Sequence, residues 1–170
     1  MSVCMDTTSV PRWEEERRIA DRGRTFTILS FGEEATEPAR KLLPLFTDRR
    51  VDWNRLPAEW SVTAARLLGR QLDASRVGWR LILVGPEAAV LAAHAEAMAG
   101  GLVDDEIMPV AVGSADRTVY CAHCHATHLA AADVGRTTSC PQCHAKLVVY
   151  HHVSRKHGAY LGYMIDAEER

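Results

Sequence analysis

Long apolar runs are missing from this chain of 170 residues, and aromatic residues make up only 6% of it. No segment approaches the roughly 20 consecutive apolar residues that a transmembrane helix needs, so the sequence predicts no membrane span. Neither sign of charge dominates, because 20 Lys and Arg stand against 22 Asp and Glu. This balance argues against a strongly basic nucleic-acid binder. The first residues show no basic start followed by an apolar stretch, so we expect a cytoplasmic protein without a secretory signal.

Catalytic signatures are missing as well. The chain contains no Gly-x-Ser-x-Gly, no His-Glu-x-x-His and no P-loop motif. The glycine-rich dinucleotide fingerprint is also absent; its place is taken by Val84-Gly85-Pro86-Glu87. Pro86 removes a backbone N–H donor, and Glu87 puts a negative charge where a phosphate would lie. We therefore expect a tight turn here, no cofactor-binding residue and no catalytic residue in this chain.

The residues that are present divide the chain into two modules. Seven of the eight histidines lie at or beyond His123, and four of the five cysteines lie within residues 121–143. All four tryptophans lie before this region. We predict a charged N-terminal arm at residues 1–24, an α/β domain at 25–113 and a second, metal-stabilised domain at 117–166. Cys4, near the N-terminus, is expected to be a free thiol.

Hydrophobic patterning in the first module indicates alternating strands and helices. Phe26–Phe31 and Trp79–Val84 are short buried-type strands, and Ser61 is a good N-cap for a helix that follows it. The order predicted is β-α-α-β-α-β, which is typical of a small parallel sheet covered by helices. The expected strands are 26–31, 79–84 and 107–112, and the expected helices are 35–46, 62–72 and 87–98.

Two C-x2-C pairs carry the strongest signal in the chain. Cys121-Ala-His-Cys124 and Cys140-Pro-Gln-Cys143 are separated by fifteen residues. Each pair turns two sulfurs toward one point, and two such turns complete the tetrahedron that zinc prefers. A module of about fifty residues has too small a core to be stable alone, so a structural metal would decide its folding. We predict that Cys121, Cys124, Cys140 and Cys143 bind zinc in a ribbon-like β module.

Five other interpretations of this region stay open. Iron fits the same thiolate cage, as in rubredoxin electron carriers, although His125 and His144 stand where rubredoxin turns usually have glycine. Disulfides are disfavoured in a cytoplasmic chain. Both pairs also match the C-x-x-C-H motif of covalent haem attachment, a reaction that normally requires export. Nucleic-acid binding would require clustered basic residues with interleaved aromatics, whereas the basic residues of this module are scattered. No full ligand pattern supports a second metal site among its histidines.

Two segments at the end of the chain are apolar on both faces of a strand. In residues 147–153, Leu147, Val149 and Val153 alternate with Val148 and Tyr150. Residues 159–165 show the same two-sided pattern. A thin ribbon cannot cover both faces by itself, so we expect the first module or another protein to cover one of them.

These motifs resemble a known family. The segments Val119-Tyr-Cys-Ala-His-Cys-His125, Cys140-Pro-Gln-Cys143, Leu147-Val-Val-Tyr-His-His-Val-Ser154 and Ala159-Tyr-Leu-Gly162 resemble the C-terminal domain of the dimethylamine monooxygenase small subunit (DmmA) family. Trp79-Arg-Leu-Ile-Leu-Val-Gly-Pro86 and the alanine-rich segment after it are similar to that family's N-terminal domain. His144 departs from the pattern, which more often has glycine there.

The resemblance implies a role in a multi-subunit oxygenase. A haem-bearing subunit would demethylate dimethylamine to methylamine and formaldehyde with O2, and a reductase with a flavin and an iron–sulfur cluster would deliver electrons from NAD(P)H. This chain would be a small third subunit without its own active site. Its N-terminal half is also similar to the nucleotide-binding lobe of ferredoxin reductases, shortened and without their phosphate loop. The resemblance thus implies haem, flavin and iron–sulfur cofactors on partner subunits, and neither nucleic acid nor membrane as a partner.

Overall fold

The computed structural model describes residues 9–10, 23–113 and 116–165, and these fall into two compact units. The α/β unit contains residues 23–113. The C-terminal unit contains residues 116–165 together with Ser9 and Val10. The remainder of the expected N-terminal arm, and with it Cys4, lies outside the described residues. None of the described helices is long and apolar enough to cross a lipid bilayer.

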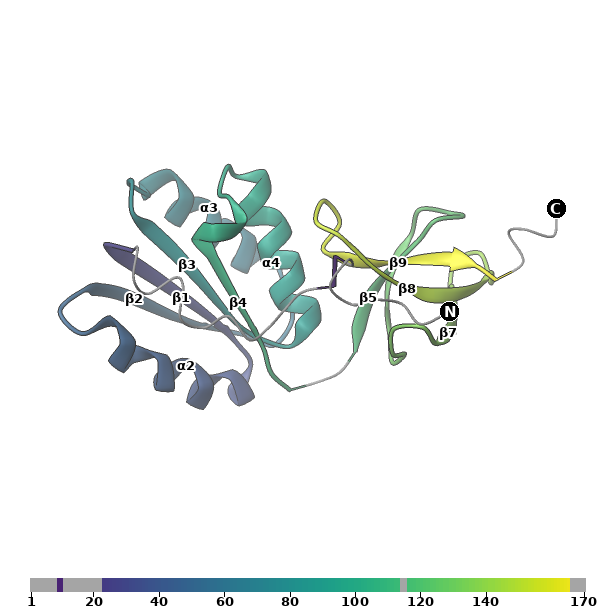
Figure 1. Cartoon of the computed structure of the whole chain (residues 1–170), viewed down its shortest axis with the longest axis horizontal. Helices are drawn as coiled ribbons and strands as arrows, with labels where there is room; N and C mark the ends of the chain where they lie inside the picture. The colour runs from purple at the N-terminus through teal and green to yellow at the C-terminus, as the bar shows by residue number, and fades with distance from the viewer. Residues whose placement is uncertain (1–8, 11–22, 114–115, 166–170) are drawn as a thin grey trace. The chain divides into compact units, whose positions relative to one another are not determined.

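A parallel four-stranded sheet forms the centre of the α/β unit, in the order β2-β1-β3-β4 (Figure 1). The two central strands are almost wholly buried, which agrees with their mostly apolar sequences. The strands are β1 (Thr25–Phe31), β2 (Arg50–Leu56), β3 (Trp79–Gly85) and β4 (Ile107–Ala111). The predicted parallel α/β architecture is confirmed.

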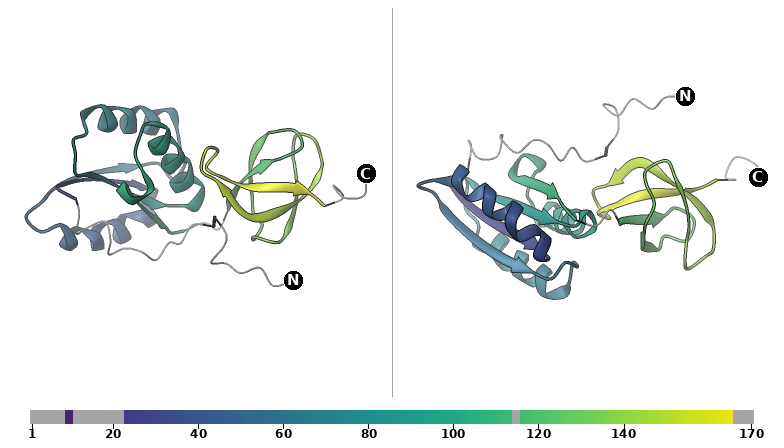
Figure 2. Two further views of the ribbon diagram at one scale, coloured as in Figure 1. Left: turned by 45° about the horizontal axis from the view of Figure 1, so that its top comes forward. Right: turned by 90° about the horizontal axis from the view of Figure 1, so that it is seen from below.

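Helices cover both faces of this sheet. The helices are α2 (Thr36–Leu42), α3 (Val62–Ala74) and α4 (Glu87–Ala99), with 3-10 turns η2 (Glu33–Ala35), η3 (Leu43–Phe46) and η4 (Asp104–Glu106). One core joins α3 and α4 to Leu29, Leu81 and Leu83, and the other joins α2 to Ile28 and Ile82. Alternate residues of β1 and β3 therefore feed opposite cores, as Figures 1 and 2 show by the placement of the helices.

Strand β2 is a correction to the sequence-based order. Residues 50–56 read Arg-Val-Asp-Trp-Asn-Arg-Leu and were not expected to form a strand, because most of them are polar. The segment lies at the edge of the sheet and pairs with β1 alone, so one side of it faces solvent and tolerates charge. Trp53 is fixed by its indole N–H, which donates to Ser30 Oγ at 2.9 Å. The observed order is β-α-β-α-β-α-β.

The C-terminal unit is rich in strands. Its sheet has the order β6-β5-β9-β8-β7, with β5 and β9 parallel and the other neighbours antiparallel. Strands β8 and β9 confirm the two apolar segments expected at the end of the chain, whereas β6 and β7 are too short and polar to have been predicted. The strands are β5 (Arg117–Cys121), β6 (Thr127–Ala130), β7 (Thr137–Ser139), β8 (Lys146–Ser154) and β9 (Ala159–Met164).

Candidate metal centre

Two tight turns of the same form carry the four cysteines. In the first, between β5 and β6, the His125 N–H donates to Cys121 O at 2.8 Å, and the Cys121 N–H donates to Ala126 O at 2.8 Å. The second turn, between β7 and β8, repeats this pattern from Cys140 to Ala145. The spacing of each C-x2-C pair is thus converted by the backbone into a loop that presents both sulfurs on one side.

Strand β9 holds the two turns together. It pairs with β5, which leads into the first turn, and with β8, which follows the second. The Ala122 N–H donates to Gly162 O, and the Ile165 N–H donates to Lys146 O, so β9 makes a backbone bond near each turn. A Cβ on Gly162 would lie only 2.8 Å from Val119 Cγ1. The close approach of the strands beneath the cysteines therefore requires glycine at this position.

The four sulfurs lie at tetrahedral spacing. The Sγ atoms of Cys121, Cys124, Cys140 and Cys143 are all within 4.8 Å of one another. Cys121 Sγ is 3.8 Å from Cys143 Sγ, and Cys124 Sγ is 3.6 Å from Cys140 Sγ. A tetrahedron with zinc–sulfur bonds of about 2.3 Å has edges of about 3.8 Å. Four sulfur donors at this spacing therefore fit a tetrahedral thiolate metal site. The sequence predicted such a site from the same four residues.

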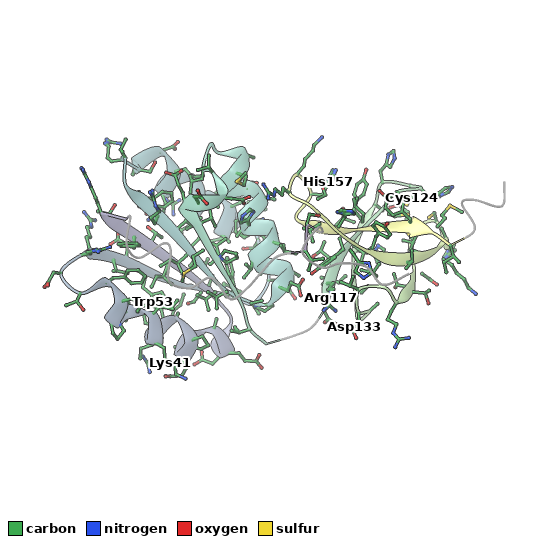
Figure 3. All side chains as sticks on the ribbon, in the orientation of Figure 1. Lys41, Trp53, Arg117, Cys124, Asp133 and His157 are labelled. Atoms are coloured by element: carbon green, nitrogen blue, oxygen red, sulfur yellow. The ribbon has the colours of Figure 1, made fainter. Side chains whose placement is uncertain are left out.

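These distances also bear on two of the alternatives. Disulfide sulfurs lie about 2.05 Å apart, so the separations of 3.6 and 3.8 Å are not those of bonded pairs. All four thiols converge on one centre, with Cys121 and Cys140 buried and Cys124 and Cys143 partly exposed (Cys124 is labelled in Figure 3). This convergence leaves neither C-x-x-C-H motif with a separate pair of thiols for a haem. Iron remains compatible with the same tetrahedron.

Crowding moves the pKa values of Cys140 and Cys124 in opposite directions. Burial acts to raise the pKa of the Cys140 thiol, but the N–H groups of Cys143 and Gln142, with neighbouring thiols, lower it to about 7. The Ala126 N–H acts to lower the pKa of Cys124, yet burial and the other three sulfurs raise it to about 12. Four adjacent thiolates repel one another unless a cation lies between them. A divalent metal supplies that charge, and its binding releases the remaining protons.

The histidine after each cysteine pair adopts a left-handed backbone conformation, with φ of 64° at His125 and 59° at His144. Glycine has no steric penalty in this region, whereas a residue with a Cβ has one. This geometry explains why glycine is common after such turns. Among the described residues, these cysteines are the one group of three or more potential ligands close enough to share a metal, so no second site forms around His123 or His125.

We predict that His144→Gly stabilises the metal-loaded protein by up to about 1 kcal/mol, because it removes the left-handed strain. The measurement is chemical denaturation of the zinc-bound chain. His123→Gly is the matched control, since His123 does not have a positive φ. The control should lose stability through the added freedom of the unfolded chain. Equal losses from both substitutions would contradict the argument from strain.

His128 is a buried feature that the sequence did not reveal. Both ring nitrogens are inaccessible to solvent and have no hydrogen-bond partner within the described part of the chain. Burial lowers the pKa of His128 from its usual 6.5. The unfolded chain therefore binds a proton more tightly than the folded chain. Above pH 6.5 the ring is neutral in both states and adds no pH dependence, whereas its protonation opposes folding as the pH falls below 6.5 toward the lowered pKa.

His128→Leu is accordingly predicted to reduce the loss of stability between pH 8 and pH 5. The measurement is the free energy of unfolding of the zinc-bound chain at several pH values. His123→Leu, at an exposed position, serves as the control for the changes in zinc affinity that all variants share. If wild type and His128→Leu have parallel pH profiles, the explanation fails.

Carboxylates surround the edge of the sheet where parallel α/β folds commonly bind phosphate. Glu33 and Glu34 follow β1, Glu59 follows β2, and the nearly buried Glu87 follows β3. A Cβ on Gly85 would lie 2.7 Å from Phe31 Cβ, so this glycine is required by the contact with β1. The Val84-Gly85-Pro86-Glu87 segment is thus a turn from β3 into α4, at an edge whose charge disfavours an anion.

Ser9 is a further contact that sequence reasoning missed. The Val153 N–H donates to Ser9 Oγ at 2.9 Å, and Ser9 Oγ lies 3.1 Å from His152 Nδ1. This bond lies at the end of a register shift between β8 and β9, where the regular pairing is interrupted. A residue far away in sequence thus completes the β8 backbone, which no local sequence signal indicates.

Comparison with known proteins assigns the chain to a family. Residues 118–163 match the family model described as the dimethylamine monooxygenase subunit DmmA-like, C-terminal domain. The heme-dependent oxidative N-demethylase delta subunit of Ectopseudomonas mendocina (strain ymp) is 42% identical over 121 residues, which cover 71% of this chain and 68% of that protein. No solved structure matches the chain. The chain therefore belongs to the DmmA-like family of dimethylamine monooxygenase subunits.

Proposed function

We propose that this chain is a non-catalytic small subunit of a haem- and flavin-dependent dimethylamine monooxygenase. The assembly would convert dimethylamine to methylamine and formaldehyde with NAD(P)H and O2. Family membership supports the role of a subunit, since the relative from E. mendocina is itself a delta subunit of a heme-dependent oxidative N-demethylase. We place the haem on an oxygenase subunit, and the flavin and iron–sulfur cluster on a reductase subunit. This chain would dock both in the cytoplasm.

The observation that carries the proposal is the closed four-sulfur site. We propose that Cys121, Cys124, Cys140 and Cys143 hold one zinc ion, with the C-terminal unit acting as a zinc ribbon. Four thiolates fill the tetrahedron, so no position remains for a substrate or a reactive water. Bound zinc would tie the turn after β5 to the turn after β7. The zinc would have a structural role and no catalytic one. The subunit would offer a rigid surface to its partners.

The α/β unit is proposed to serve as a scaffold without a bound nucleotide. The acidic edge beside Gly85 supports this role, because a diphosphate would lie among Glu33, Glu34 and Glu87. The unit retains the parallel sheet that a shortened reductase nucleotide lobe would have. Calorimetric titration of the isolated full chain with NADPH tests whether the unit binds a nucleotide. We expect no heat of binding.

Reconstitution tests the function as a whole. The full chain alone should show no NAD(P)H oxidation with dimethylamine, whereas the oxygenase and reductase subunits should lose coupled turnover when this chain is left out. Turnover by the isolated chain would overturn the proposal, as would full activity of the other subunits without it.

A rubredoxin-like electron carrier is the second candidate, and one observation favours it. The same sulfur tetrahedron suits iron as well as zinc. In that function the chain would lie on the path of electrons from the reductase to the haem. Left-handed histidines after both turns, in place of the usual glycines, favour zinc over this alternative.

A further inference from the structure

One face of the C-terminal sheet is exposed and has few charged residues. The registers of the five strands place alternate residues on a common side. The inner side contains Val119, Leu147, Val149 and Tyr160, which are buried. We call the opposite side the outer face. Its residues include Thr118, Tyr120, Thr127, Leu129, Thr137, Ser139, Lys146, Val148, Tyr150, Leu161 and Tyr163.

Large side chains on the outer face remain open to solvent. Leu129 is 62% exposed, Tyr150 43% and Tyr163 42%, and Ile165 at the end of β9 is 53% exposed. The sequence suggested strands that are apolar on both sides; the structure buries one side and leaves the other exposed. Five strands about 4.8 Å apart, with three to nine residues each, give a face of roughly 400 Å². Patches of this size on a single protein commonly mark an interaction site.

Aromatic rings on this face are held in place. Tyr150 and Tyr163 meet edge to face, with ring centroids 5.5 Å apart, and Tyr120 stacks on His157 at 4.2 Å. Rings fixed in this way lose little conformational freedom when a partner covers them. Tyrosine is among the residues most enriched in the energetically dominant centres of protein interfaces.

The charge pattern indicates what kind of partner fits. Lys146 is the one Lys, Arg, Asp or Glu among the residues that the registers place on the outer face, and it lies at the margin, at the first position of β8. Arg117 belongs to the inner side, where it pairs with Asp133 at 2.9 Å (both are labelled in Figure 3). A nucleic acid would require cations across the face, whereas a charged peptide would find only Lys146 at the margin to pair with.

We propose that the outer face docks an uncharged, apolar surface of another subunit of the monooxygenase assembly. This inference rests on the proposed function, which supplies the partner, and adds the residues that bind it. Tyr163 and Tyr150 form the centre of the contact, and Leu129 extends it to the edge strand β6. The face alone is smaller than the roughly 800 Å² per partner of a standard interface, so neighbouring loops contribute the rest.

The test uses the zinc-loaded full chain and the purified oxygenase and reductase subunits. Tyr163→Glu and Leu129→Glu should each weaken binding of one subunit by about 30-fold or more, since a charge would be buried without a partner. Tyr163→Phe keeps the ring and should stay within about 3-fold of wild type. Val77→Glu is the matched control, because Val77 is 95% exposed on the α/β unit. Zinc content and circular dichroism show whether each variant is folded.

Three outcomes would overturn the inference, each in a different way. If wild type binds a subunit and the folded Glu variants bind it equally well, the face is wrongly assigned, while the proposed function stands. If Tyr163→Glu instead separates a dimer of this chain without affecting subunit binding, the occupant is a second copy. If wild type binds neither subunit, the proposed function falls together with the inference.

Discussion

Cys140→Ser is expected to unfold the C-terminal unit and to leave the α/β unit folded. The buried Cys140 thiol is one of four that converge on a single centre, and the small unit around it depends on that centre for its stability. Zinc in comparable small domains contributes an apparent 10–16 kcal/mol at about pH 7, far more than such a core supplies by itself. The variant should therefore lose both its metal and the β-sheet signal of this unit.

Denaturation followed by two probes measures this effect. Tryptophan fluorescence reports the α/β unit, because Trp53, Trp60 and Trp79 all lie there. Exchange of backbone amides in β8 and β9 reports the C-terminal unit. Removing zinc from wild type with a strong chelator should reproduce the result, and Ser139→Ala, beside Cys140 but without a thiol, should leave zinc content unchanged. A Cys140→Ser chain whose β8 and β9 amides remain protected would show that the metal does not hold this unit together.

Leu83→Ala is expected to have the largest effect on the α/β unit, destabilising it by about 2–5 kcal/mol. Leu83 is fully buried in the central strand β3, in the core shared with α3 and α4. Its truncation leaves a cavity that the tightly packed helices cannot fill. Zinc content and metal affinity should not change, because the cysteines belong to the other unit.

Leu45→Ala provides the control for this prediction. It removes the same atoms from a leucine that is 46% exposed, so it should cost well under 1 kcal/mol. Urea denaturation monitored by tryptophan fluorescence gives both values. Similar losses from the two substitutions, or a loss of zinc in Leu83→Ala, would contradict the division into separately stabilised units.

The central strands and the cysteine cluster were predictable because their signals are local. Phe26–Phe31 and Trp79–Val84 are mostly apolar, as is typical of strands buried on both faces. The C-x2-C spacing is typical of a tight turn that directs two sulfurs to one side. The sequence alone therefore predicted that the four cysteines share one site. The helix expected over residues 35–46 ends earlier than that, because α2 ends at Leu42 and the chain continues as the 3-10 turn η3, which contains Pro44.

Features that depend on distant residues were not predictable. The polar sequence of β2 becomes a strand through its pairing with β1, and Trp53 is satisfied by Ser30 on that neighbour. The bond from Val153 to Ser9 spans most of the chain. The sequence predicted two apolar faces in β8 and β9, but it could not say which one the unit buries, since that depends on the register of five strands.

The metal content and visible spectrum of the full chain, expressed alone with both zinc and iron supplied, test the central claim most directly. A structural zinc subunit predicts a colourless protein with one zinc per chain and no spectral change on adding dithionite. A red protein with one iron per chain that bleaches with dithionite would contradict the account, because the four cysteines would then carry electrons.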